Sequence, residues 1–261
     1  MSRRRGAAPA FSQPIAGFHA VLAALRAGRV TGLRLAQGRR DARSRELQAL
    51  AGQMEVPLRR VSREELDALG LGAHQGVVAE VSGERGMGDE AELEQLLESL
   101  GAAGEAPLLL ALEGLTDPRN LGACLRSADA AGAHAVVVPR SRTAPLTPAA
   151  RKTASGAAET LPVIAVPNLA RTLRWLVQRG LRIVGLAAEG DHAPWDEDLS
   201  SGCALVVGAE DSGLRRLTRQ HCDALVALPM AGTVESLNVS VAAGLALFEV
   251  VRQRSSDSAS G

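Results

Sequence analysis

The chain has 261 residues and a formal net charge of zero, and its length suggests about two domains of roughly 150 residues each. Hydrophobic residues make up 46% of it but aromatic residues only 2%, and there is no Tyr, so the core must be built from Leu, Val and Ala, and aromatic platforms for base stacking are scarce. The three cysteines lie far apart without a C-x-x-C pair, which argues against a zinc site and for free thiols in a reducing compartment, by default the cytoplasm.

The start of the chain has a basic cluster followed by the apolar run Ile15 to Leu25, the order found in secretion signals. Pro14 and His19 interrupt the run, Arg26 closes it, and no small-residue cleavage site follows. We therefore expect a disordered basic tail over residues 1–13 and an amphipathic helix after it. No stretch approaches the roughly 18 apolar residues of a membrane span, so no membrane partner is expected.

The charges are segregated along the chain. Residues 1–63 hold 13 Arg against 3 acids, a net charge of +10, whereas residues 64–105 hold 11 acids against one Arg, a net charge of −10. Residues 106–261 balance at 15 and 15. The segregation indicates either a basic module that meets a polyanion, followed by an acidic, solvated connector, or arginines that simply coat a small domain, and the charges alone leave both open.

The first predicted domain is a small α/β unit over residues 14–83. Ser62 followed by Glu65 has the spacing of a capping box at the start of a helix. The expected elements are helix 17–26, strand 32–36, helix 43–53, strand 57–61, a helix from Ser62 to Leu69 and a final strand within AHQGVVAEV. Residues 84–105, rich in Gly, Glu and Ser, are expected to form an acidic flexible linker with one short helix from Glu90 to Leu100.

The second predicted domain, residues 106–254, has a regular rhythm of apolar strands, most of them separated by helices. The strands are expected at Leu108–Leu112, Ala135–Val138, Pro162–Val166, Arg182–Ala187, Ala204–Val207 and Ala224–Leu228. Continuous apolar strands that alternate with helices predict a mostly parallel sheet with helices on both faces, so the fold class is α/β. Residues 255–261 are expected to be a disordered tail.

The last predicted helix, Val239 to Val251, is apolar all the way round. A terminal helix that covers one face of a sheet should keep a polar stripe toward solvent. We therefore expect a second side of this helix to be buried as well, most simply against a second copy of the chain.

Two loops directly after strands, GAEDSG and MAGTVESLN, are the places to look for chemistry, because ligands of open α/β sheets bind beyond the carboxyl ends of the strands. The turn after the first strand of the second domain, EGLTDPRNLG, lacks a G-x-G-x-x-G fingerprint, and the chain has no P-loop and no G-x-S-x-G motif. On these patterns alone, GAEDSG would be an ordinary strand-to-helix turn.

Three segments in order, DPRNLGACLRSADAAG, GAEDSGLRR and ESLNVSVAAGLALFE, resemble the three motifs of the SpoU (TrmH-type) ribose 2'-O-methyltransferases of the SPOUT class. The likeness covers residues 106–254, and GFHAVLAAL and AHQGVVAEV are similar to the small N-terminal RNA-binding domain of part of that family. The resemblance implies S-adenosyl-L-methionine as cofactor, bound at a C-terminal trefoil knot, and an obligate homodimer. It also implies a guanosine of 23S ribosomal RNA, in the peptidyl-transferase region, as the substrate.

Eight residues of this chain match functional positions of the family's motifs. The resemblance implies a catalytic set and a cofactor-binding set, which are Asn120, Arg126, Glu210, Ser236 and Asn238 for catalysis and Gly208, Leu228 and Leu237 for the cofactor. Two of them have a plain structural alternative: Arg126 has the spacing for an ion pair with Asp129 on its helix, and Asn238 stands where a helix N-cap belongs. The motif favours catalysis for Arg126, whereas both roles of Asn238 can hold together.

Methyl transfer from a sulfonium needs no metal, because the leaving group departs neutral. The ribose hydroxyl is almost fully protonated at neutral pH, so it needs a base or a stabiliser of the developing alkoxide. No His lies within the three motifs and the chain has no Tyr, which leaves Arg126 and Glu210. Because a guanidinium stays protonated in proteins, we expect Arg126 to stabilise the alkoxide and align the hydroxyl, with the proton passing to an RNA phosphate or to water.

Three other functions stay open at this point. The same chemistry on transfer RNA or on another ribosomal RNA site is one. A non-catalytic RNA-binding factor of ribosome assembly is another, against which the intact motif positions argue. A nucleotide-dependent oxidoreductase is disfavoured by the missing dinucleotide fingerprint.

Overall fold

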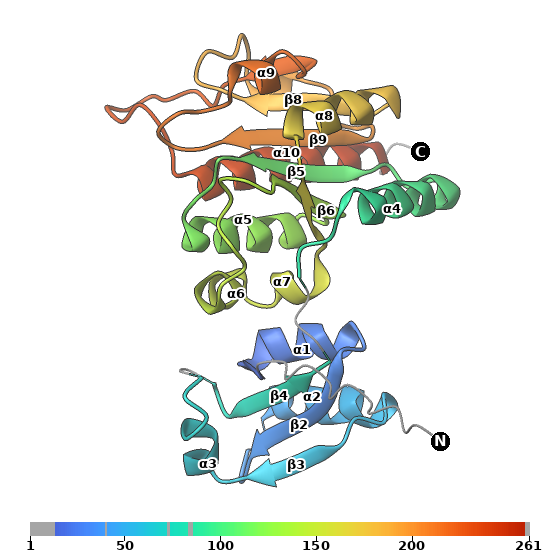
Figure 1. Cartoon of the computed structure of the whole chain (residues 1–261), viewed down its shortest axis with the longest axis vertical. Helices are drawn as coiled ribbons and strands as arrows, with labels where there is room; N and C mark the ends of the chain where they lie inside the picture. Colours follow the sequence, from blue (N-terminus) through green and yellow to red (C-terminus); the bar gives the residue numbers. More distant parts are fainter. Residues whose placement is uncertain (1–13, 40, 72–73, 83–85, 259–261) are drawn as a thin grey trace, which may run out of the picture. The chain divides into compact units, whose positions relative to one another are not determined.

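The computed structural model describes residues 14–39, 41–71, 74–82 and 86–258. The chain folds into two compact units, Met1–Arg85 and Gly86–Gly261, here called the N-terminal and the C-terminal unit (Figure 1). Each unit has hydrophobic clusters of its own. The basic tail predicted over residues 1–13 lies outside the described residues.

The N-terminal unit is built on a four-stranded sheet with the order β1-β4-β2-β3. Strands β2 and β3 run parallel, and β4 is antiparallel to both of its neighbours. Its elements are β1 (Ile15–Ala16), α1 (Phe18–Arg26), β2 (Val30–Ala36), α2 (Ala42–Gln53), β3 (Leu58–Val61), α3 (Arg63–Asp67) and β4 (Val77–Val81). Compared with the prediction, the sheet gains only the two-residue strand β1.

Side-chain alternation along β2 divides the core of this unit. Leu33 and Leu35 are buried in the cluster that contains the apolar residues of α1 and α2, whereas Ala36 packs against a smaller cluster that includes Leu66 of α3. The predicted cap of α3 is confirmed, because Ser62 Oγ accepts a hydrogen bond from the Glu65 amide at 3.1 Å.

The C-terminal unit contains a six-stranded, fully parallel sheet with the order β10-β8-β9-β5-β6-β7. The strands are β5 (Leu108–Glu113), β6 (Ala135–Pro139), β7 (Val163–Val166), β8 (Arg182–Leu186), β9 (Cys203–Gly208) and β10 (Ala224–Val226). The predicted parallel sheet is therefore confirmed. Because all strands run the same way, their carboxyl ends lie along one edge, where the loops of interest follow β5, β9 and β10.

Helices cover both faces of this sheet, as predicted. Alternate residues of β5 face opposite layers: Leu110 and Leu112 belong to one hydrophobic cluster, and Leu109 and Ala111 to the other. The first layer holds α5 (Pro118–Ala130), α6 (Pro148–Ala154), α7 (Ala157–Thr160) and α10 (Val239–Ser258), and the second holds α4 (Glu90–Ala103) and α8 (Leu169–Gln178). The short helix α9 (Arg216–Arg219) precedes β10, and a 3-10 turn (Pro194–Asp196) lies between β8 and β9.

The segment expected to be a flexible acidic linker differs from that expectation in its described part, residues 86–105. The short helix expected from Glu90 is confirmed as α4, which extends to Ala103, but its Leu93, Leu97 and Leu100 are buried in the sheet core. Gly88 pairs with Ile164 beside β7, so the segment belongs to the C-terminal unit. The composition misled because the acids occupy the outer face of α4 and hide an apolar stripe with helical spacing.

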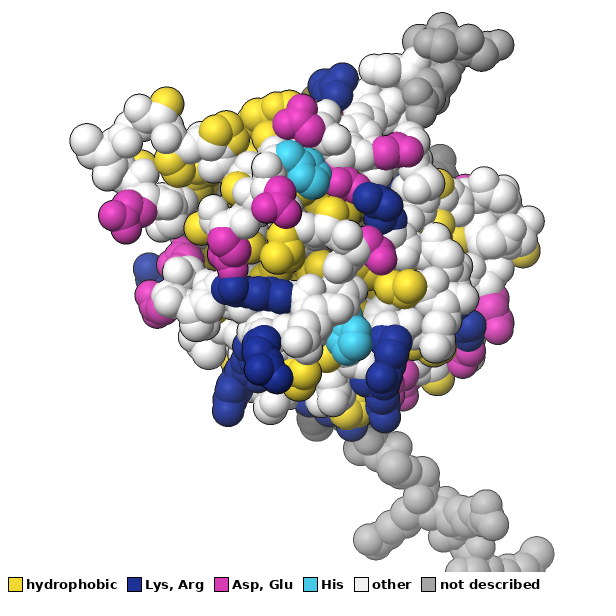
Figure 2. Space-filling model, turned by 90° about the horizontal axis from the view of Figure 1, so that it is seen from above, with side chains coloured by type: hydrophobic (Ala, Val, Ile, Leu, Met, Phe, Trp, Pro, Cys, Tyr) yellow, Lys and Arg dark blue, Asp and Glu magenta, His cyan; other side chains and the backbone are white. Residues whose placement is uncertain are grey.

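Two acids of α4 pair with arginines at the two ends of α8, Arg171 in its first turn and Arg179 at its C-cap. Arg171 Nη2 contacts Glu90 Oε1 at 2.8 Å, and Arg179 pairs with Glu94. Figure 2 shows one face of the molecule, on which basic and acidic side chains lie interspersed around exposed hydrophobic side chains. Two of the arginines on the α8 side of the sheet are thus paired within the chain.

Helix α10 buries one side and exposes an apolar stripe on another. Val239, Ala243 and Leu247 are buried against the sheet, whereas Leu245 and Phe248 are each 51% exposed. The expected second copy of the chain stays a prediction, and the exposed stripe is the surface available for it. No helix within the described ranges is long and apolar enough to cross a membrane.

Helix α10 also runs to Ser258, beyond the predicted end at Val251 and into the expected tail. Two serines extend it by bonding back along the helix: Ser255 Oγ donates to the Val251 carbonyl at 2.7 Å, and Ser256 Oγ to the Arg252 carbonyl at 2.9 Å. Arg254 adds hydrogen bonds to three carbonyl oxygens, those of Ala106, Pro107 and Ser201.

Candidate active site

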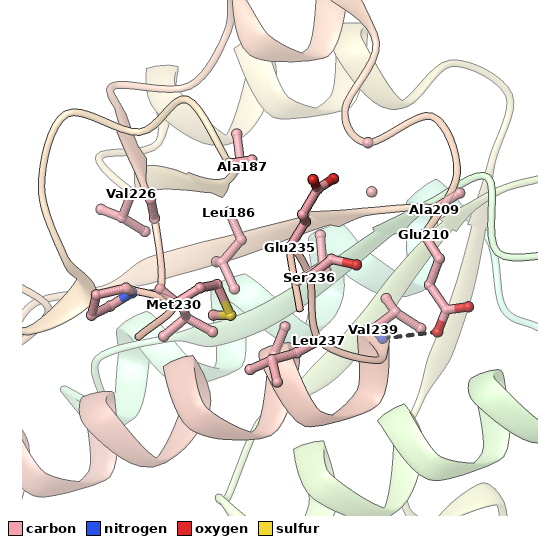
Figure 3. A pocket seen from close by; sticks show the side chains of 18 residues that line it. Leu186, Ala187, Ala209, Glu210, Val226, Met230, Glu235, Ser236, Leu237 and Val239 are labelled. Atoms are coloured by element: carbon pink, nitrogen blue, oxygen red, sulfur yellow. Dashed lines mark hydrogen bonds between the residues drawn. The ribbon is translucent and has the colours of Figure 1, made fainter. Parts of the chain in front are cut away.

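A cavity of about 430 Å³ opens at the carboxyl ends of β8, β9 and β10 (Figure 3). Its walls are the segments Leu186–Ala188, Val207–Glu210 and Val226–Met230, together with residues 235–237 and the start of α10. Both loops singled out in the sequence, GAEDSG and MAGTVESLN, contribute to it. Its volume lies within the range of about 300–1,000 Å³ usual for small-molecule and cofactor sites.

Glycine is required where the GAEDSG turn folds back on itself. A Cβ on Gly208 would lie 2.1 Å from the carbonyl carbon of Gly213, a distance no side chain tolerates. The Gly213 amide donates to the Ala209 carbonyl at 2.8 Å, and Gly213 has a φ of 58°, in the left-handed region that favours glycine. The two glycines therefore allow the tight turn, and at both positions the cavity is lined by backbone atoms.

Three polar residues, one from each motif, form a single hydrogen-bonded cluster at the rim of the cavity. The Asn238 amide nitrogen donates to Glu210 Oε1 at 2.6 Å and to Asn120 Oδ1 at 3.0 Å. The Asn120 amide nitrogen donates to the same Glu210 oxygen at 3.3 Å. The cluster joins the start of α5, the turn after β9 and the start of α10.

The same cluster caps α10. Glu210 Oε1 accepts from the Val239 amide at 3.1 Å, and Asn238 Oδ1 accepts from the Ser240 amide at 3.0 Å and its hydroxyl at 2.6 Å. Two of the first free amides of the helix are thus satisfied, one by its own N-cap and one by a residue from another segment. The structural alternative for Asn238 is confirmed, and it coexists with a position beside the cavity.

The structure brings seven of the eight predicted residues together and leaves one apart. Gly208, Glu210, Leu228, Ser236 and Leu237 line the cavity, and Asn120 and Asn238 join it through Glu210. Arg126 lies further along α5, exposed and outside the cavity wall.

The ion pair considered for Arg126 is absent. The Asp129 carboxylate accepts instead from the Thr160 hydroxyl at 2.9 Å, and no described carboxylate pairs with Arg126. Its guanidinium therefore faces solvent in the single chain.

Glu113, at the end of β5, is a positioning residue that the motif analysis missed. Its side chain is buried, and it accepts from the Arg215 amide at 2.8 Å and from the Thr218 hydroxyl at 2.7 Å, which fixes the start of α9. Arg219 of α9 donates to the Leu214 carbonyl and pairs with Glu189. The sequence did contain a signal for this residue, because an acidic residue ends the otherwise apolar strand β5. A carboxylate in such a position is buried only when it has hydrogen-bond partners.

The cysteines are not nucleophiles. Burial, and to a smaller extent the Glu210 carboxylate, raises the pKa of the Cys124 thiol to about 12. Burial likewise raises the pKa of Cys222 to about 12 and that of Cys203 to about 11. At neutral pH all three thiols are therefore protonated, which disfavours a role as nucleophiles.

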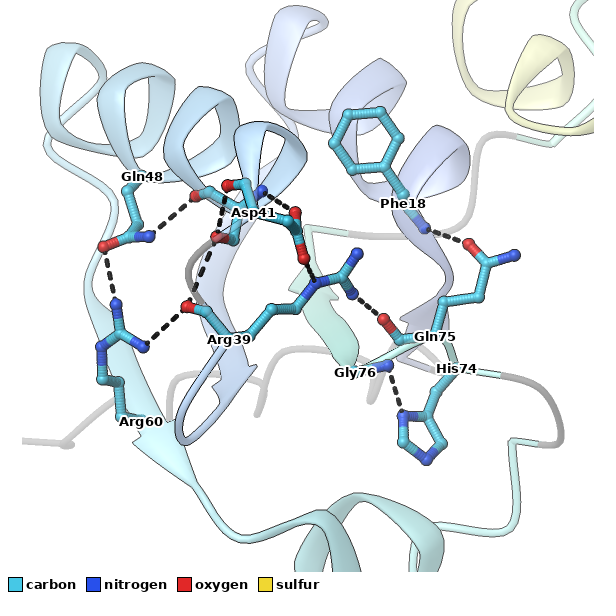
Figure 4. A network of polar contacts seen from close by, with 9 residues as sticks. Phe18, Arg39, Asp41, Gln48, Arg60, His74, Gln75 and Gly76 are labelled. Carbon is cyan, nitrogen blue, oxygen red and sulfur yellow. Dashed lines mark hydrogen bonds and ion pairs between the residues drawn. The ribbon is translucent and has the colours of Figure 1, made fainter.

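The N-terminal unit has a polar network around the turn before β4 (Figure 4). Gln75, at a φ of 51°, accepts from the Phe18 amide through its side chain and from Arg39 through its carbonyl. His74 accepts from the Gly76 amide at 3.0 Å and contacts Asp67 at 2.8 Å, so it is a structural histidine with both ring nitrogens engaged. Among the described residues, Arg60 donates hydrogen bonds to the neutral acceptors of Gln48 and Arg39, and no described carboxylate compensates its charge.

Comparison with known families matches both units. Residues 107–248 match the SpoU rRNA Methylase family, and residues 14–86 match the family described as RNA 2'-O ribose methyltransferase substrate binding. The SpoU match covers more than half of the chain.

Relatives of known name are similar over nearly the whole chain. A 23S rRNA (guanosine-2'-O-)-methyltransferase RlmB of Pseudomonas syringae pv. tomato is 54% identical over 245 residues, covering 93% of this chain and 96% of that protein. The protein of the same name from Escherichia coli K12 is 49% identical over 247 residues, 94% and 100% of the two chains. The solved SpoU methyltransferase AviRb from Streptomyces viridochromogenes, in complex with the cofactor AdoMet, superimposes with a TM-score of 0.72 at 28% identity, covering 93% and 90%. The chain, with its three motifs joined at one cavity, belongs to the SpoU rRNA methylase family.

Proposed function

We propose that the chain transfers a methyl group from S-adenosyl-L-methionine to the ribose 2'-hydroxyl of a guanosine in 23S ribosomal RNA, in the peptidyl-transferase region. The observation that carries the proposal is the cluster of Asn120, Glu210 and Asn238, which joins all three motifs at one cavity. The relatives that are 49–54% identical bear names that state this reaction on 23S RNA.

The residues present fit the cofactor. Leu186, Val226, Leu228 and Leu237 supply apolar walls for an adenine ring, and the backbone at Gly208 can approach the ligand because no side chain intervenes. When bound, the sulfonium supplies an electrophilic methyl group and leaves as a neutral thioether. The chain's own task is to hold the ribose hydroxyl in line and to stabilise its developing negative charge.

Arg126 is the group proposed to carry that charge stabilisation. It is exposed and has no carboxylate partner among the described residues, so its guanidinium is available to RNA. Glu210 has a different role, because one of its oxygens already accepts three N–H groups. We assign Glu210, Asn120 and Asn238 to fixing the loops around the reacting atoms and Ser236 to a polar contact inside the cavity.

We further propose a homodimer that uses α10. The exposed Leu245 and Phe248 border a groove that also contains the 51% exposed Trp195. Leu228 and Leu237 line both this groove and the cavity. A second copy on α10 would cover an apolar surface and close the cavity in one step, which favours a dimer over a monomeric enzyme.

A trefoil knot is proposed from the way the chain passes the crossover between β8 and β9. On one side a Cβ on Gly190 would lie 2.3 Å from the Val226 backbone, and His192 pairs with Val226. On the other side Gln253 of α10 accepts from the Leu199 amide at 2.8 Å. The crossover is thus held between β10 and α10, which supports a chain threaded beneath it.

The remaining assignments follow from this function. Residues 14–83 are proposed to bind the RNA substrate, in agreement with Arg60, whose charge no described carboxylate compensates, and with the family match of that unit. A reaction on ribosomal RNA is proposed to take place in the cytoplasm. Transfer RNA or another ribosomal RNA site is the alternative substrate, and a non-catalytic RNA-binding factor of ribosome assembly is the alternative of another class.

Methyl transfer from labelled cofactor to 23S fragments tests the proposal, with the modified ribose located by mass mapping. We expect one guanosine in the peptidyl-transferase region to be modified, and transfer RNA to stay unmodified at equal concentration. Calorimetry with S-adenosyl-L-methionine separates the alternatives, because a folded protein that binds RNA but no cofactor would be an assembly factor.

A further inference from the structure

Lys152 stands out because of the composition of the chain. Of the 29 Lys and Arg residues, 28 are Arg and the only Lys is Lys152. Arginine serves wherever positive charge alone is needed, but its planar guanidinium does not replace the compact ammonium at every site. A chain that uses arginine almost exclusively therefore draws attention to the one position with an ammonium.

The helix that carries Lys152 is pressed against α5. A Cβ on Gly122 of α5 would lie 2.3 Å from the Ala150 carbonyl oxygen of α6, so the two helices meet backbone to backbone. Arg119 and Arg126 lie three residues before and four residues after Gly122, which puts both on the face of α5 that meets α6. Lys152 itself is exposed.

The loop from β6 to α6 adds two more cations. The Ala144 amide donates to the Leu115 carbonyl at 2.7 Å, so this loop runs beside the turn that precedes α5. Arg140 and Arg142, just before that contact, are both exposed. Together with those of α5 and α6 they form what we call the α5–α6 surface, defined by Arg119, Arg126, Arg140, Arg142 and Lys152.

The α5–α6 surface is positive, and none of its five cations pairs with a carboxylate in the described part of the chain. Residues 114–156 hold six cations against two acids, a net charge of +4, whereas residues 157–261 hold nine against twelve, a net charge of −3. Of the six cations only Arg151 pairs with a described carboxylate, the buried Glu159 at 2.7 Å. Arg171 and Arg179, on the other layer of the sheet, are exposed and yet paired with carboxylates, so exposure by itself does not prevent pairing.

We infer that the α5–α6 surface binds the phosphodiester backbone of the RNA substrate and that Lys152 contacts a phosphate there. The inference rests on the proposed function. The surface adjoins the reacting site, because Asn120 of α5 is hydrogen-bonded to Glu210 at the cavity rim. Cations without a carboxylate partner bind a polyanion favourably, because their binding releases the counterions condensed on it. A lysine ammonium binds a phosphate as a point charge.

The single lysine makes a direct test possible. The full-length protein is treated with an amine-acylating reagent, with and without the 23S fragment that it methylates, and acylation at Lys152 is followed by peptide mass spectrometry. With RNA at about ten times its Kd, acylation should slow by about tenfold, because protection follows the bound fraction. The cofactor alone should give no protection, because Lys152 does not line the cavity.

The R174K variant supplies the control. Arg174 is exposed on α8, on the other layer of the sheet, and has no carboxylate partner within the described ranges. The amine that R174K adds should acylate at the same rate with and without RNA. If Lys152 stays fully reactive while the RNA is being methylated, the inference is wrong although the proposed function stands; if the wild type methylates no 23S RNA, the proposed function itself has failed.

Kinetics give a second readout. K152Q should raise the KM for RNA by about threefold with little change in kcat, and it should lower the slope of log affinity against log salt by about 0.7 to 0.9, the value for one lost phosphate contact. K152R should keep the wild-type salt slope, because the charge is retained. Its KM should lie between those of the wild type and K152Q, because a planar guanidinium replaces the compact ammonium. R174Q should match the wild type. An unchanged KM and slope in K152Q would overturn the phosphate contact, and full recovery of KM in K152R would overturn the need for an ammonium.

Discussion

Asn238 and Glu210 are joined by a 2.6 Å hydrogen bond from the side-chain amide to the carboxylate, and Glu210 in turn accepts from the backbone amide of Val239. The two residues come from different motifs, yet together they begin helix α10. Helix capping and the assembly of the cavity rim are therefore one structural event. A change at either residue should affect stability and catalysis at the same time.

Replacement of Glu210 by Ala tests this coupling. The loss of an acceptor at the start of α10 should lower the free energy of unfolding by about 1 kcal/mol, the usual cost of losing a helix cap. Methyl transfer should fall more than the stability loss explains, because Asn120 and Asn238 lose their common partner. Urea denaturation and initial rates measure the two effects. Asp211→Ala, next to Glu210 but outside the cluster, is the control and should change neither.

Replacement of Glu113 should lower the affinity for the cofactor but not the affinity for RNA. Glu113→Ala leaves the Arg215 amide and the Thr218 hydroxyl without their acceptor, each at about 1–3 kcal/mol if it stays buried. Affinity for S-adenosyl-L-methionine should fall in calorimetry while RNA affinity stays constant. Glu113→Gln, which keeps one carbonyl oxygen, should lie between wild type and Glu113→Ala. Equal losses of cofactor and RNA affinity would point to global unfolding instead.

Arg126 should act on turnover and not on cofactor binding. Arg126→Ala should lower kcat by about 100-fold, the scale for removing one stabiliser of a developing oxyanion, and leave the cofactor Kd unchanged because Arg126 is outside the cavity wall. Arg126→Lys keeps the positive charge but loses the planar guanidinium with its several N–H donors, so it should recover only part of the rate. A near-wild-type rate with an unchanged pH profile in Arg126→Lys would contradict the assigned role.

The exposed stripe of α10 should carry the dimer. Leu245→Glu and Phe248→Glu should shift the protein from dimer to monomer in analytical ultracentrifugation, because a charge in an apolar interface stays unpaired. Val177→Glu, a 40% exposed hydrophobic residue on α8, is the matched control and should stay dimeric. A wild-type protein that sediments as a monomer at all concentrations would refute the dimer outright.

The buried Cys124 should not react with thiol reagents in the folded protein at pH 8. Folding raises the pKa of Cys124 from 9.0 to about 12, so the thiol is protonated in the folded state and reacts with a thiol reagent only after unfolding. Because the folded pKa is the higher one, this group contributes full stability below pH 9, and the contribution is lost as the pH rises toward 12. Thiol titration with and without urea measures the first effect, and urea denaturation between pH 8 and 10.5 the second. Rapid labelling of Cys124 in the folded protein at pH 8 would contradict its burial.

Local patterns were enough to predict the parallel sheet. Each of its strands is a short apolar run. A strand that is covered on both faces is apolar along its whole length, so it can be recognised without knowledge of its neighbouring strands. The Ser62 cap was predictable for the same reason, because donor and acceptor lie three residues apart. The motif resemblance added the positions of the polar residues along the chain.

What local patterns left open depends on contacts between distant segments. Asn120 lies 90 residues from Glu210 and 118 from Asn238, so no local rule fixes their hydrogen bonds. The composition of α4 also concealed its membership of the core.

By itself, then, the sequence determined most of the strands and helices and which residues belong to the motifs, because those properties are set by neighbours along the chain. Only the tertiary structure decided that three motifs share one carboxylate at the cavity rim, that Glu113 anchors α9, and that Arg126 stands outside the cavity. The physical reason is that hydrogen-bond partners, burial and unpaired charge are relations across space, which exist only once the sheet has brought the carboxyl ends of its strands together.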